Sequence, residues 1–115
     1  MATDCVFCKI ASEEIPADLL YEDDDVLAFR DLSPQAPVHV LIIPRKHIRS
    51  LDSLWDADTE IIGKIAILAR DLARRLGVAE SGYRLVNNCG IQAGQTVPHL
   101  HFHLLGGRNL GWPPG

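Results

Sequence analysis

One long stretch of helical periodicity, with strand-like segments on both sides, is the feature of this sequence that most constrains its fold. Apolar side chains recur at three- and four-residue steps at Ile61, Ile65, Leu68, Leu72 and Leu76. Asp56 or Asp58 can cap the start of this stretch, and Gly77 can adopt the left-handed conformation that ends a helix. These signals predict a single long helix, whose acidic start and arginine-rich end suit the helix dipole.

Segments with the composition of strands lie before and after this helix. Residues 26–31 and 38–43 are rich in β-branched and aromatic side chains and are joined by a turn-like, proline-containing linker. Residues 83–88 and 99–105 have the same character. Near the N-terminus, a short apolar pattern that stops at Pro16 predicts a short helical turn followed by a loop. The order of strands, helix and strands predicts an α+β fold in which an antiparallel sheet packs on the helix.

Length and composition predict one domain, residues 1–115, and exclude several classes of protein. The chain is long enough for one hydrophobic core and too short for two, and a 47% hydrophobic content is typical of a globular chain. A net charge of -4 argues against duplex nucleic acid as a partner. We expect neither export nor membrane anchoring, because no signal-like segment or run of about 20 apolar residues occurs. Three cysteines do not make an even disulfide framework, so a reducing, cytoplasmic location is expected.

Three of the five histidines of the chain fall within five residues, at His99, His101 and His103. Because side chains alternate between the faces of a strand, the three rings are predicted to share one face, with Leu100 and Phe102 on the other. An alternating strand can simply expose polar rings to water. The concentration of three rings in one short segment favours a functional site instead.

Two kinds of chemistry could use such a cluster. Three imidazoles could hold a catalytic zinc ion, but same-face side chains of one strand lie in a row that suits a tetrahedral ion poorly. Alternatively, one neutral imidazole could attack phosphorus and form a covalent intermediate that water then hydrolyses. The preceding Gly94, Gln95 and Thr96 offer amide and hydroxyl donors that stabilise charge on phosphate oxygens. We therefore favour the nucleophilic interpretation and expect no catalytic metal.

Residues 95–105 closely resemble the signature of the histidine-triad (HIT) family, in which three histidines alternate with apolar residues. Other segments resemble the Hint branch of that family, so nearly the whole chain is covered: residues 7–10, 14–17, 21–24, 31–37, 43–47, 106–108 and 112–115. The resemblance implies a homodimer with a HIT-like α+β fold. It also implies an enzyme that binds purine nucleotides and cleaves the P–N bond of adenosine and related purine nucleoside 5′-phosphoramidates.

The same resemblance implies roles for individual residues. His101 is the implied nucleophile, which becomes nucleotidylated before water releases the nucleoside monophosphate. His39, placed near the base and the triad, and His103 are implied catalytic partners, and Thr96 assists the leaving group. The implied contacts of the α-phosphate are His101, His103, Asn88, Gly94, Gln95 and Thr96. The implied pocket for base and ribose consists of Phe7, Ile10, Phe29, Leu32 and Asp31.

One point of this assignment agrees with the residue pattern itself. Phe29 and Asp31 are two residues apart on a predicted strand, and so they share a face. An aromatic wall would then stand beside a carboxylate. Without the histidines, a core phenylalanine and an aspartate that starts a turn explain the two residues equally well.

Cys5 and Cys8 have the spacing of half a structural zinc site. In some histidine-triad relatives, two histidines complete such a site, and the matching residues here are His47 and His99. Two thiolates and two imidazoles suit tetrahedral zinc, so we predict a structural zinc ion. The alternative is a pair of free thiols, because Hint proteins that lack these cysteines need no metal.

Two further hypotheses about function stay open at this point. The same nucleophile could attack the α-phosphorus of a dinucleoside polyphosphate or of an adenylylated carrier. The chain could also be a nucleotide-sensing or partner-binding module whose hydrolysis is incidental. An intact triad counts against the second hypothesis, because a pure binding site needs no nucleophile.

Overall fold

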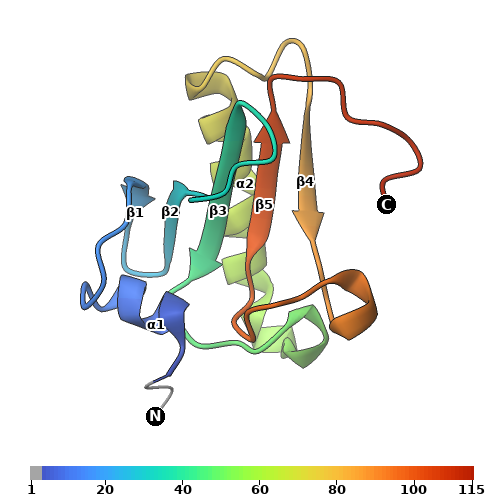
Figure 1. Ribbon diagram of the computed structural model, residues 1–115. Coiled ribbons are helices and arrows are strands. Elements are labelled where there is room, and N and C mark those ends of the chain that lie inside the picture. The colour runs from blue at the N-terminus through green and yellow to red at the C-terminus, as the bar shows by residue number, and fades with distance from the viewer. Residues whose placement is uncertain (1–3) are drawn as a thin grey trace.

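A computed structural model describes residues 4–115 of the chain. These residues form a five-stranded antiparallel sheet with the strand order β1-β2-β3-β5-β4, packed on one long helix (Figure 1). The strands are β1 (Leu19–Glu22), β2 (Val26–Arg30), β3 (Val38–Pro44), β4 (Tyr83–Asn87) and β5 (Phe102–Gly106). The helices are α1 (Val6–Ala11), α2 (Thr59–Arg75) and the one-turn 3-10 helices Leu51–Ser53, Asp56–Asp58 and Ile91–Ala93. The predicted α+β fold, with one long helix and a short N-terminal helix, is confirmed.

Helix α2 covers one face of the sheet and buries the larger part of the core (Figure 1). Its buried side chains are Ile65, Leu68, Ala69, Leu72 and Ala73. They pack against side chains of β2, β3 and β5, which include Val26, Val40, Ile42 and Leu104. Asp58 is the N-cap residue, and Gly77 has a φ of 79° just beyond the helix end, as the sequence predicts. Neither α2 nor another helix of residues 4–115 is long and apolar enough to cross a membrane.

Helix α1 lies on the opposite face of the sheet, where a smaller apolar cluster forms. The buried members of this cluster are Phe7, Leu27, Phe29, Leu41 and Ile43. At the start of α1, the Sγ atom of Cys5 accepts a hydrogen bond from the backbone amide of Cys8. The capping residue of α1 is therefore also a thiol that faces the first turn of the helix.

Two strands differ from the expectation based on sequence. Strand β1 lies in a segment that was predicted to be a loop. It is a four-residue edge strand with a register shift between Leu19 and Tyr21. Such a segment is too short to show strand periodicity. The prediction of a strand over residues 99–105 is wrong at its start, because β5 begins at Phe102. His99 and His101 precede the strand, and only His103 belongs to it.

The late start of β5 has a local cause. The Nε2 atom of His99 lies 2.9 Å from the carbonyl oxygen of Pro44, so a side chain binds the last carbonyl of β3. The amide of Leu100 donates instead to the carbonyl of Ile48, 2.6 Å away. These bonds draw residues 99–101 out of the ladder and let the rings of His99 and His101 enter different surroundings.

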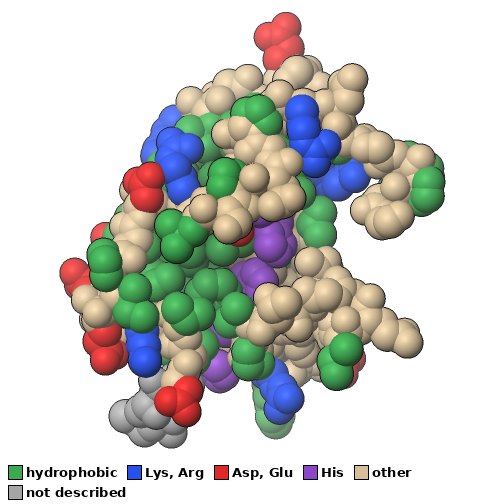
Figure 2. Space-filling view, viewed as in Figure 1, with side chains coloured by type: hydrophobic (Ala, Val, Ile, Leu, Met, Phe, Trp, Pro, Cys, Tyr) green, Lys and Arg blue, Asp and Glu red, His purple; other side chains and the backbone are tan. Residues whose placement is uncertain are grey.

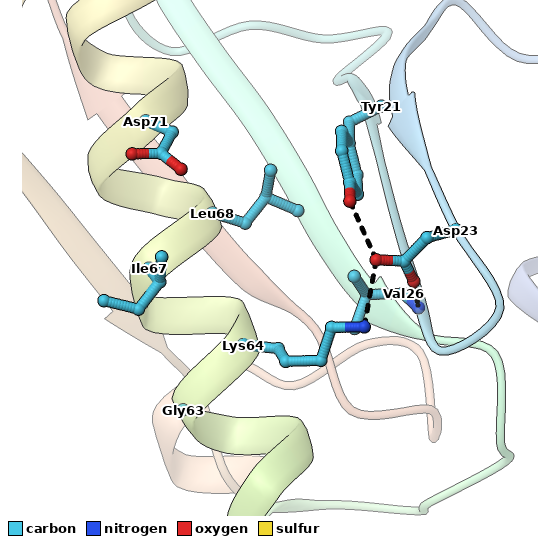
Figure 3. A pocket seen from close by; sticks show the side chains of 8 residues that line it. All are labelled: Tyr21, Asp23, Val26, Gly63, Lys64, Ile67, Leu68 and Asp71. Carbon is cyan, nitrogen blue, oxygen red and sulfur yellow. Dashed lines mark hydrogen bonds and ion pairs between the residues drawn. The ribbon is translucent and has the colours of Figure 1, made fainter.

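The turn between β1 and β2 is fastened to α2 beside a surface pocket (Figure 3). Lys64 Nζ lies 3.0 Å from Asp23 Oδ2 and 2.8 Å from Asp25 Oδ2, and the Tyr21 hydroxyl donates to Asp23. Burial raises the pKa of Asp23, but hydrogen bonds from the amides of Asp25 and Val26 and from Lys64 outweigh it and hold this pKa well below its usual range. The pocket lies on the α2 side of the sheet and contains no histidine or cysteine.

Gly106, in β5, lies close to Val78 in the segment after α2. A Cβ atom at this position would lie 2.9 Å from the Cβ of Val78, which is 4% exposed and, as a β-branched residue, cannot easily rotate away. We expect Gly106→Ala to lower the free energy of unfolding in urea by about 1 to 3 kcal/mol. The matched control is Gly63→Ala in α2, where a Cβ would meet no atom within 4 Å. Equal stability of Gly106→Ala and wild type would show that β5 can shift without cost.

Candidate active site

The five histidines form a row on the α1 side of the sheet. Ring centroids are 4.9 Å apart for His47 and His99, 5.1 Å for His101 and His103, and 5.2 Å for His39 and His103. Figure 2 shows histidine side chains at the base of a hollow, between an apolar patch and a lobe of loop atoms. The row divides into a cysteine and histidine cluster at one end, a central ring, and a pair of rings at the other end.

His101 is the central ring, and it is only 5% exposed. Its Nδ1 atom lies 2.8 Å from the carbonyl oxygen of His99. Because a carbonyl oxygen can only accept a hydrogen bond, Nδ1 carries the proton and Nε2 of the neutral ring keeps its lone pair. Phe7 packs edge-on against this ring, and Asn87 Nδ2 donates to the carbonyl of His101, 3.0 Å away. The surroundings thus hold His101 in the tautomer that a nucleophilic Nε2 requires.

His39 and His103 form the pair at the end of the row. His39 Nε2 lies 2.9 Å from His103 Nδ1 and 3.5 Å from Asp31 Oδ2. Burial lowers the pKa of His39, although Asp31 acts in the opposite direction. Burial, with smaller effects of the neighbouring His101 and His39, also lowers the pKa of His103 to about 4. Near neutral pH both rings are therefore uncharged and joined by a hydrogen bond.

Asp31, His39 and His103 lie close enough together to suggest a metal site. Two imidazole nitrogens on one tetrahedral zinc ion stand about 3.3 Å apart, because Zn–N bonds are about 2.05 Å long. The 2.9 Å between His39 Nε2 and His103 Nδ1 is instead a hydrogen-bond distance. This geometry favours a hydrogen-bonded group over a ligand set, and His101 belongs to neither group of candidate metal ligands within residues 4–115.

The lowered pKa of His103 predicts a loss of stability in acid. The pKa is 6.5 for an ordinary histidine and about 4 in the folded protein, so the unfolded chain binds the proton first. The contribution of neutral His103 to the free energy of unfolding is fully present above pH 6.5. It decreases as the pH falls towards about 4, by at most about 3 kcal/mol. Urea unfolding of wild type and His103→Gln from pH 7.5 to 4.5 should show a steeper loss for wild type. Parallel curves would contradict a neutral, buried His103.

An apolar pocket lies beside the central ring. All five residues implied to hold base and ribose line this pocket, namely Phe7, Ile10, Phe29, Asp31 and Leu32. The rings of Phe7 and Phe29 meet edge to face at 5.7 Å, and Phe7 also touches His101. Asp31 directs Oδ1 to the amide of Ser33 at 2.7 Å, while Oδ2 lies near His39. The pocket therefore joins apolar walls to one carboxylate next to the candidate nucleophile.

Gln95 gives the loop between β4 and β5 its shape. Its side-chain amide donates to the carbonyls of Arg49 and Val97, at 2.9 and 3.1 Å, and its Oε1 accepts from the amide of Gly90. The backbone amide of Gln95 also donates to the carbonyl of Gly90. These contacts make Gln95 a support of the loop, and its contact with a phosphate stays a prediction.

The other residues implied to bind phosphate lie around the same loop. Asn88 directly follows β4, and Gly94 has a φ of 85° at the end of the 3-10 helix Ile91–Ala93. Thr96 is exposed and lines a surface pocket together with Gln95 and Cys89. Gly94, Gln95 and Thr96 are thus consecutive near the middle of the connection between β4 and β5, while Asn88 is its first residue.

Cys5, Cys8, His47 and His99 come together as the resemblance implies. The Nδ1 atoms of His47 and His99 are 3.2 Å apart. Cys8 Sγ lies 3.2 Å from Nδ1 of His47 and 3.5 Å from Nδ1 of His99. Cys5 Sγ lies 3.3 Å from Nδ1 of His99. Tetrahedral zinc with bonds of about 2.05 Å to nitrogen and 2.3 Å to sulfur separates its ligand atoms by about 3.3 to 3.8 Å. The four side chains could therefore hold a metal ion such as zinc with a small adjustment.

His99 has the tautomer that a metal at this cluster requires. Because its Nε2 donates to the carbonyl of Pro44, its Nδ1 keeps a lone pair on the side of the sulfur atoms. Burial lowers the pKa of His99 to about 4, which keeps the ring neutral. Burial raises the pKa of Cys8 to about 11, helped by a hydrogen bond with Cys5, so thiolate formation there depends on a cation. The carbonyl of His99 also binds His101, which links the cluster to the central ring.

Sequence reasoning missed three residues that orient the histidines. Asn87 binds the carbonyl of His101, the amide of Gln35 donates to His39 Nδ1 at 3.0 Å, and the carbonyl of Pro44 accepts from His99. The Oδ1 atom of Asn87 is buried and has no hydrogen-bond partner within residues 4–115. Only Asn87 left a signal in the sequence, as a polar side chain at the end of a strand, because every residue has the backbone groups that Gln35 and Pro44 use.

Comparison with known proteins agrees with this geometry. The family model described as "HIT domain" matches residues 12–110. The chain belongs to the HIT family. It is 50% identical to a HIT-like protein of Synechocystis over 115 residues, which is all of both chains. These matches establish the HIT family but not its Hint branch.

Solved structures of HIT proteins have the same fold. The structure of a HIT family hydrolase from Legionella pneumophila is similar with a TM-score of 0.95 and 54% identity, over 96% of this chain and 99% of that chain. A histidine triad nucleotide-binding protein from Candida albicans is similar with a TM-score of 0.81 and 36% identity, over 95% of this chain and 82% of that chain. The predicted HIT-like fold is thereby confirmed.

Proposed function

We propose that this HIT protein is a nucleotide-binding hydrolase that cleaves the P–N bond of adenosine and related purine nucleoside 5′-phosphoramidates. The observation that carries this proposal is the buried His101, whose Nδ1 donates to the carbonyl of His99 and leaves Nε2 with a lone pair. The Legionella relative is named a hydrolase and the Candida relative a nucleotide-binding protein, which supports the same class. Assignment to the Hint branch is part of this proposal.

The reaction proceeds in two displacements at phosphorus. His101 Nε2 attacks the α-phosphorus, a bond from phosphorus to the imidazole forms, and the bond to the amine breaks. The amine nitrogen keeps the electron pair and takes a proton, for which the exposed hydroxyl of Thr96 is the proposed donor. Water then attacks the same phosphorus, and one of its protons restores the Thr96 hydroxyl. The imidazole leaves with its electron pair, and a nucleoside monophosphate is released. His103, Asn88, Gly94, Gln95 and Thr96 are the proposed neighbours of the phosphate oxygens.

The substrate class follows from the pocket beside His101. Apolar walls that include Phe7, Ile10 and Phe29, with Leu32 at the exposed rim, suit a flat heterocycle such as a purine. The carboxylate of Asp31 suits the hydroxyl groups of a ribose as a hydrogen-bond acceptor. Because Phe7 touches both the pocket and His101, a nucleoside in this pocket would present its 5′-phosphate to the nucleophile.

We propose zinc as the ion of the cluster formed by Cys5, Cys8, His47 and His99. Its role is structural, because it would tie α1 to the segment that carries His101. No step of the reaction is assigned to it, since His101 belongs to neither group of candidate ligands within residues 4–115.

We also propose a homodimer that forms through β4. This strand is an outer strand of the sheet, and Tyr83 and Leu85 on it are 39% and 36% exposed. An apolar edge strand of this kind is a suitable surface for pairing with a second copy. The three free cysteines favour a reducing compartment such as the cytoplasm.

The test of this function compares three substrates with the same enzyme preparation. These are an AMP–amine conjugate, a diadenosine polyphosphate and an adenylylated carrier. The proposal expects AMP and free amine in equal amounts, with the highest kcat/KM for the conjugate. A higher kcat/KM for either other substrate would favour the second hydrolase hypothesis. Nucleotide binding without turnover of any of the three would favour a nucleotide-sensing module.

A further inference from the structure

A chain of hydrogen bonds leads from the C-terminal segment to the pair of histidines next to His101. Arg108 Nε donates to the carbonyl oxygen of Gln35 at 2.8 Å. The backbone amide of Gln35 lies 3.0 Å from His39 Nδ1, and His39 Nε2 lies 2.9 Å from His103 Nδ1. The side chain of Arg108 makes hydrogen bonds to the carbonyls of Gln35 and Asn109 and to no histidine of residues 4–115, and it is 73 positions from Gln35 in the sequence.

The direction of these bonds fixes the protons on both rings. A backbone amide can only donate, so Nδ1 of His39 holds a lone pair and Nε2 of the neutral ring carries the proton. His39 Nε2 then donates to Nδ1 of His103, which leaves the proton of the neutral His103 on its Nε2. His103 is thereby set as an N–H donor beside His101, whose ring centroid is 5.1 Å away.

This arrangement matters for a phosphate at His101. An N–H group on His103 would donate to a phosphate oxygen, whereas the other tautomer would place a lone pair against that oxygen. The amide of Gln35, with the carboxylate of Asp31 at 3.5 Å from His39 Nε2, therefore favours the tautomer in which the second ring stabilises the negative charge that develops at phosphorus. A donor held in place before the reaction needs no reorganisation when the charge develops.

The segment that contains Gln35 makes few internal hydrogen bonds. It lies between β2 and β3, has no regular secondary structure, and includes Pro34 and Pro37, which have no amide hydrogen to donate. Within it, the side chain of Gln35 donates to the carbonyl of Ser33 at 2.9 Å. Near Gln35, a hydrogen bond from Arg108 ties this segment to the residues after β5, and Pro37 lies close to Gly107. Arg108 also donates to the carbonyl of Asn109.

We propose that Arg108 is a positioning residue, which holds Gln35 so that its amide selects the tautomers of His39 and His103. The effect of Arg108 on rate rests on the proposed function, whereas its effect on the tautomers does not.

The test replaces Arg108 with methionine, which keeps the aliphatic stem and removes every donor. Long-range proton–nitrogen correlation spectra of the histidine rings at pH 7.5 should show a single tautomer of His39, protonated at Nε2, in wild type. Arg108→Met should show a mixture with the Nδ1 tautomer. The rate of a single turnover with an AMP–amine conjugate should fall by about threefold to tenfold, the worth of one net hydrogen bond, with little change in the Kd for AMP.

Two further variants separate positioning from a general loss of structure. Arg108→Lys keeps a donor and should retain the wild-type tautomer and most of the rate. Arg70→Met removes an exposed arginine of α2 that pairs with Asp71, and it should change neither quantity. Backbone amide spectra verify that each variant is folded.

The outcomes distinguish this proposal from the proposed function. An unchanged tautomer in folded Arg108→Met overturns the role of Arg108, whatever happens to the rate. A shift in tautomer in a protein that turns over no phosphoramidate would keep the role of Arg108 and refute the phosphoramidase proposal. A shift together with a lower rate supports both.

Discussion

His101→Ala is expected to abolish turnover of an AMP–amine conjugate while AMP still binds. Loss of the nucleophile should lower kcat by at least about a thousandfold, because no other group supplies the covalent route. The Kd for AMP should change little, because the proposed contacts of base and ribose come from the pocket lined by Phe7, Phe29 and Asp31. Steady-state kinetics and isothermal titration calorimetry measure the two quantities on the same preparation.

A second substitution separates chemistry from packing. His101 is buried, so alanine leaves a cavity next to Phe7. His101→Gln fills most of this space and keeps an amide donor for the carbonyl of His99, but it has no nucleophilic nitrogen. Both variants should be inactive if His101 forms the covalent bond. Activity above one tenth of wild type (about 1.4 kcal/mol in activation free energy) in His101→Gln would assign the ring a supporting role.

His47→Ala is expected to remove bound zinc and to lower the melting temperature strongly. If zinc binds the folded protein at a thousandfold excess over its Kd, its loss costs about 4 kcal/mol, or roughly 15 °C for a chain of this size. Removal of the His47 side chain should by itself change the free energy of unfolding little, because His47 is exposed. Elemental analysis and thermal unfolding, with and without a chelator, measure both effects.

The controls for this prediction use the chelator and the third cysteine. Wild type treated with a strong chelator should melt near the temperature of His47→Ala, and the chelator should not affect the variant further. Cys89→Ala lies outside the cluster and should keep its zinc. Equal zinc content in His47→Ala and wild type would refute the assignment of the four ligands.

Helix α2 and the inner strands could be predicted from the sequence because their signals extend over many residues. Seventeen residues of α2 repeat the apolar spacing over several turns, so local errors do not change the result. Strand β1 has four residues at the sheet edge and no such redundancy. The predicted start of β5 was wrong for another reason. The carbonyl of Pro44 accepts a hydrogen bond from the side chain of His99 and not from a backbone amide of β5.

The candidate site also has features that the sequence predicts and features that it does not. Side chains that carry chemistry, such as Cys5, Cys8, His47 and His99, are visible in the sequence, and the structure brings these four together. The groups that set the tautomers of the histidines are backbone carbonyls and amides, which all residues share. The bond from Arg108 to Gln35 depends on the path of two loops, and no local pattern encodes that path.

The central claim is that His101 forms a covalent bond to phosphorus, and trapping that bond tests it most directly. Enzyme mixed with an AMP–amine conjugate is quenched within a single turnover and digested, and its peptides are weighed by mass spectrometry. The account predicts one added AMP group on the peptide that contains His101, lost on treatment with acid and absent from His101→Ala. Formation of AMP without any such adduct, or an adduct on a different residue, would contradict it.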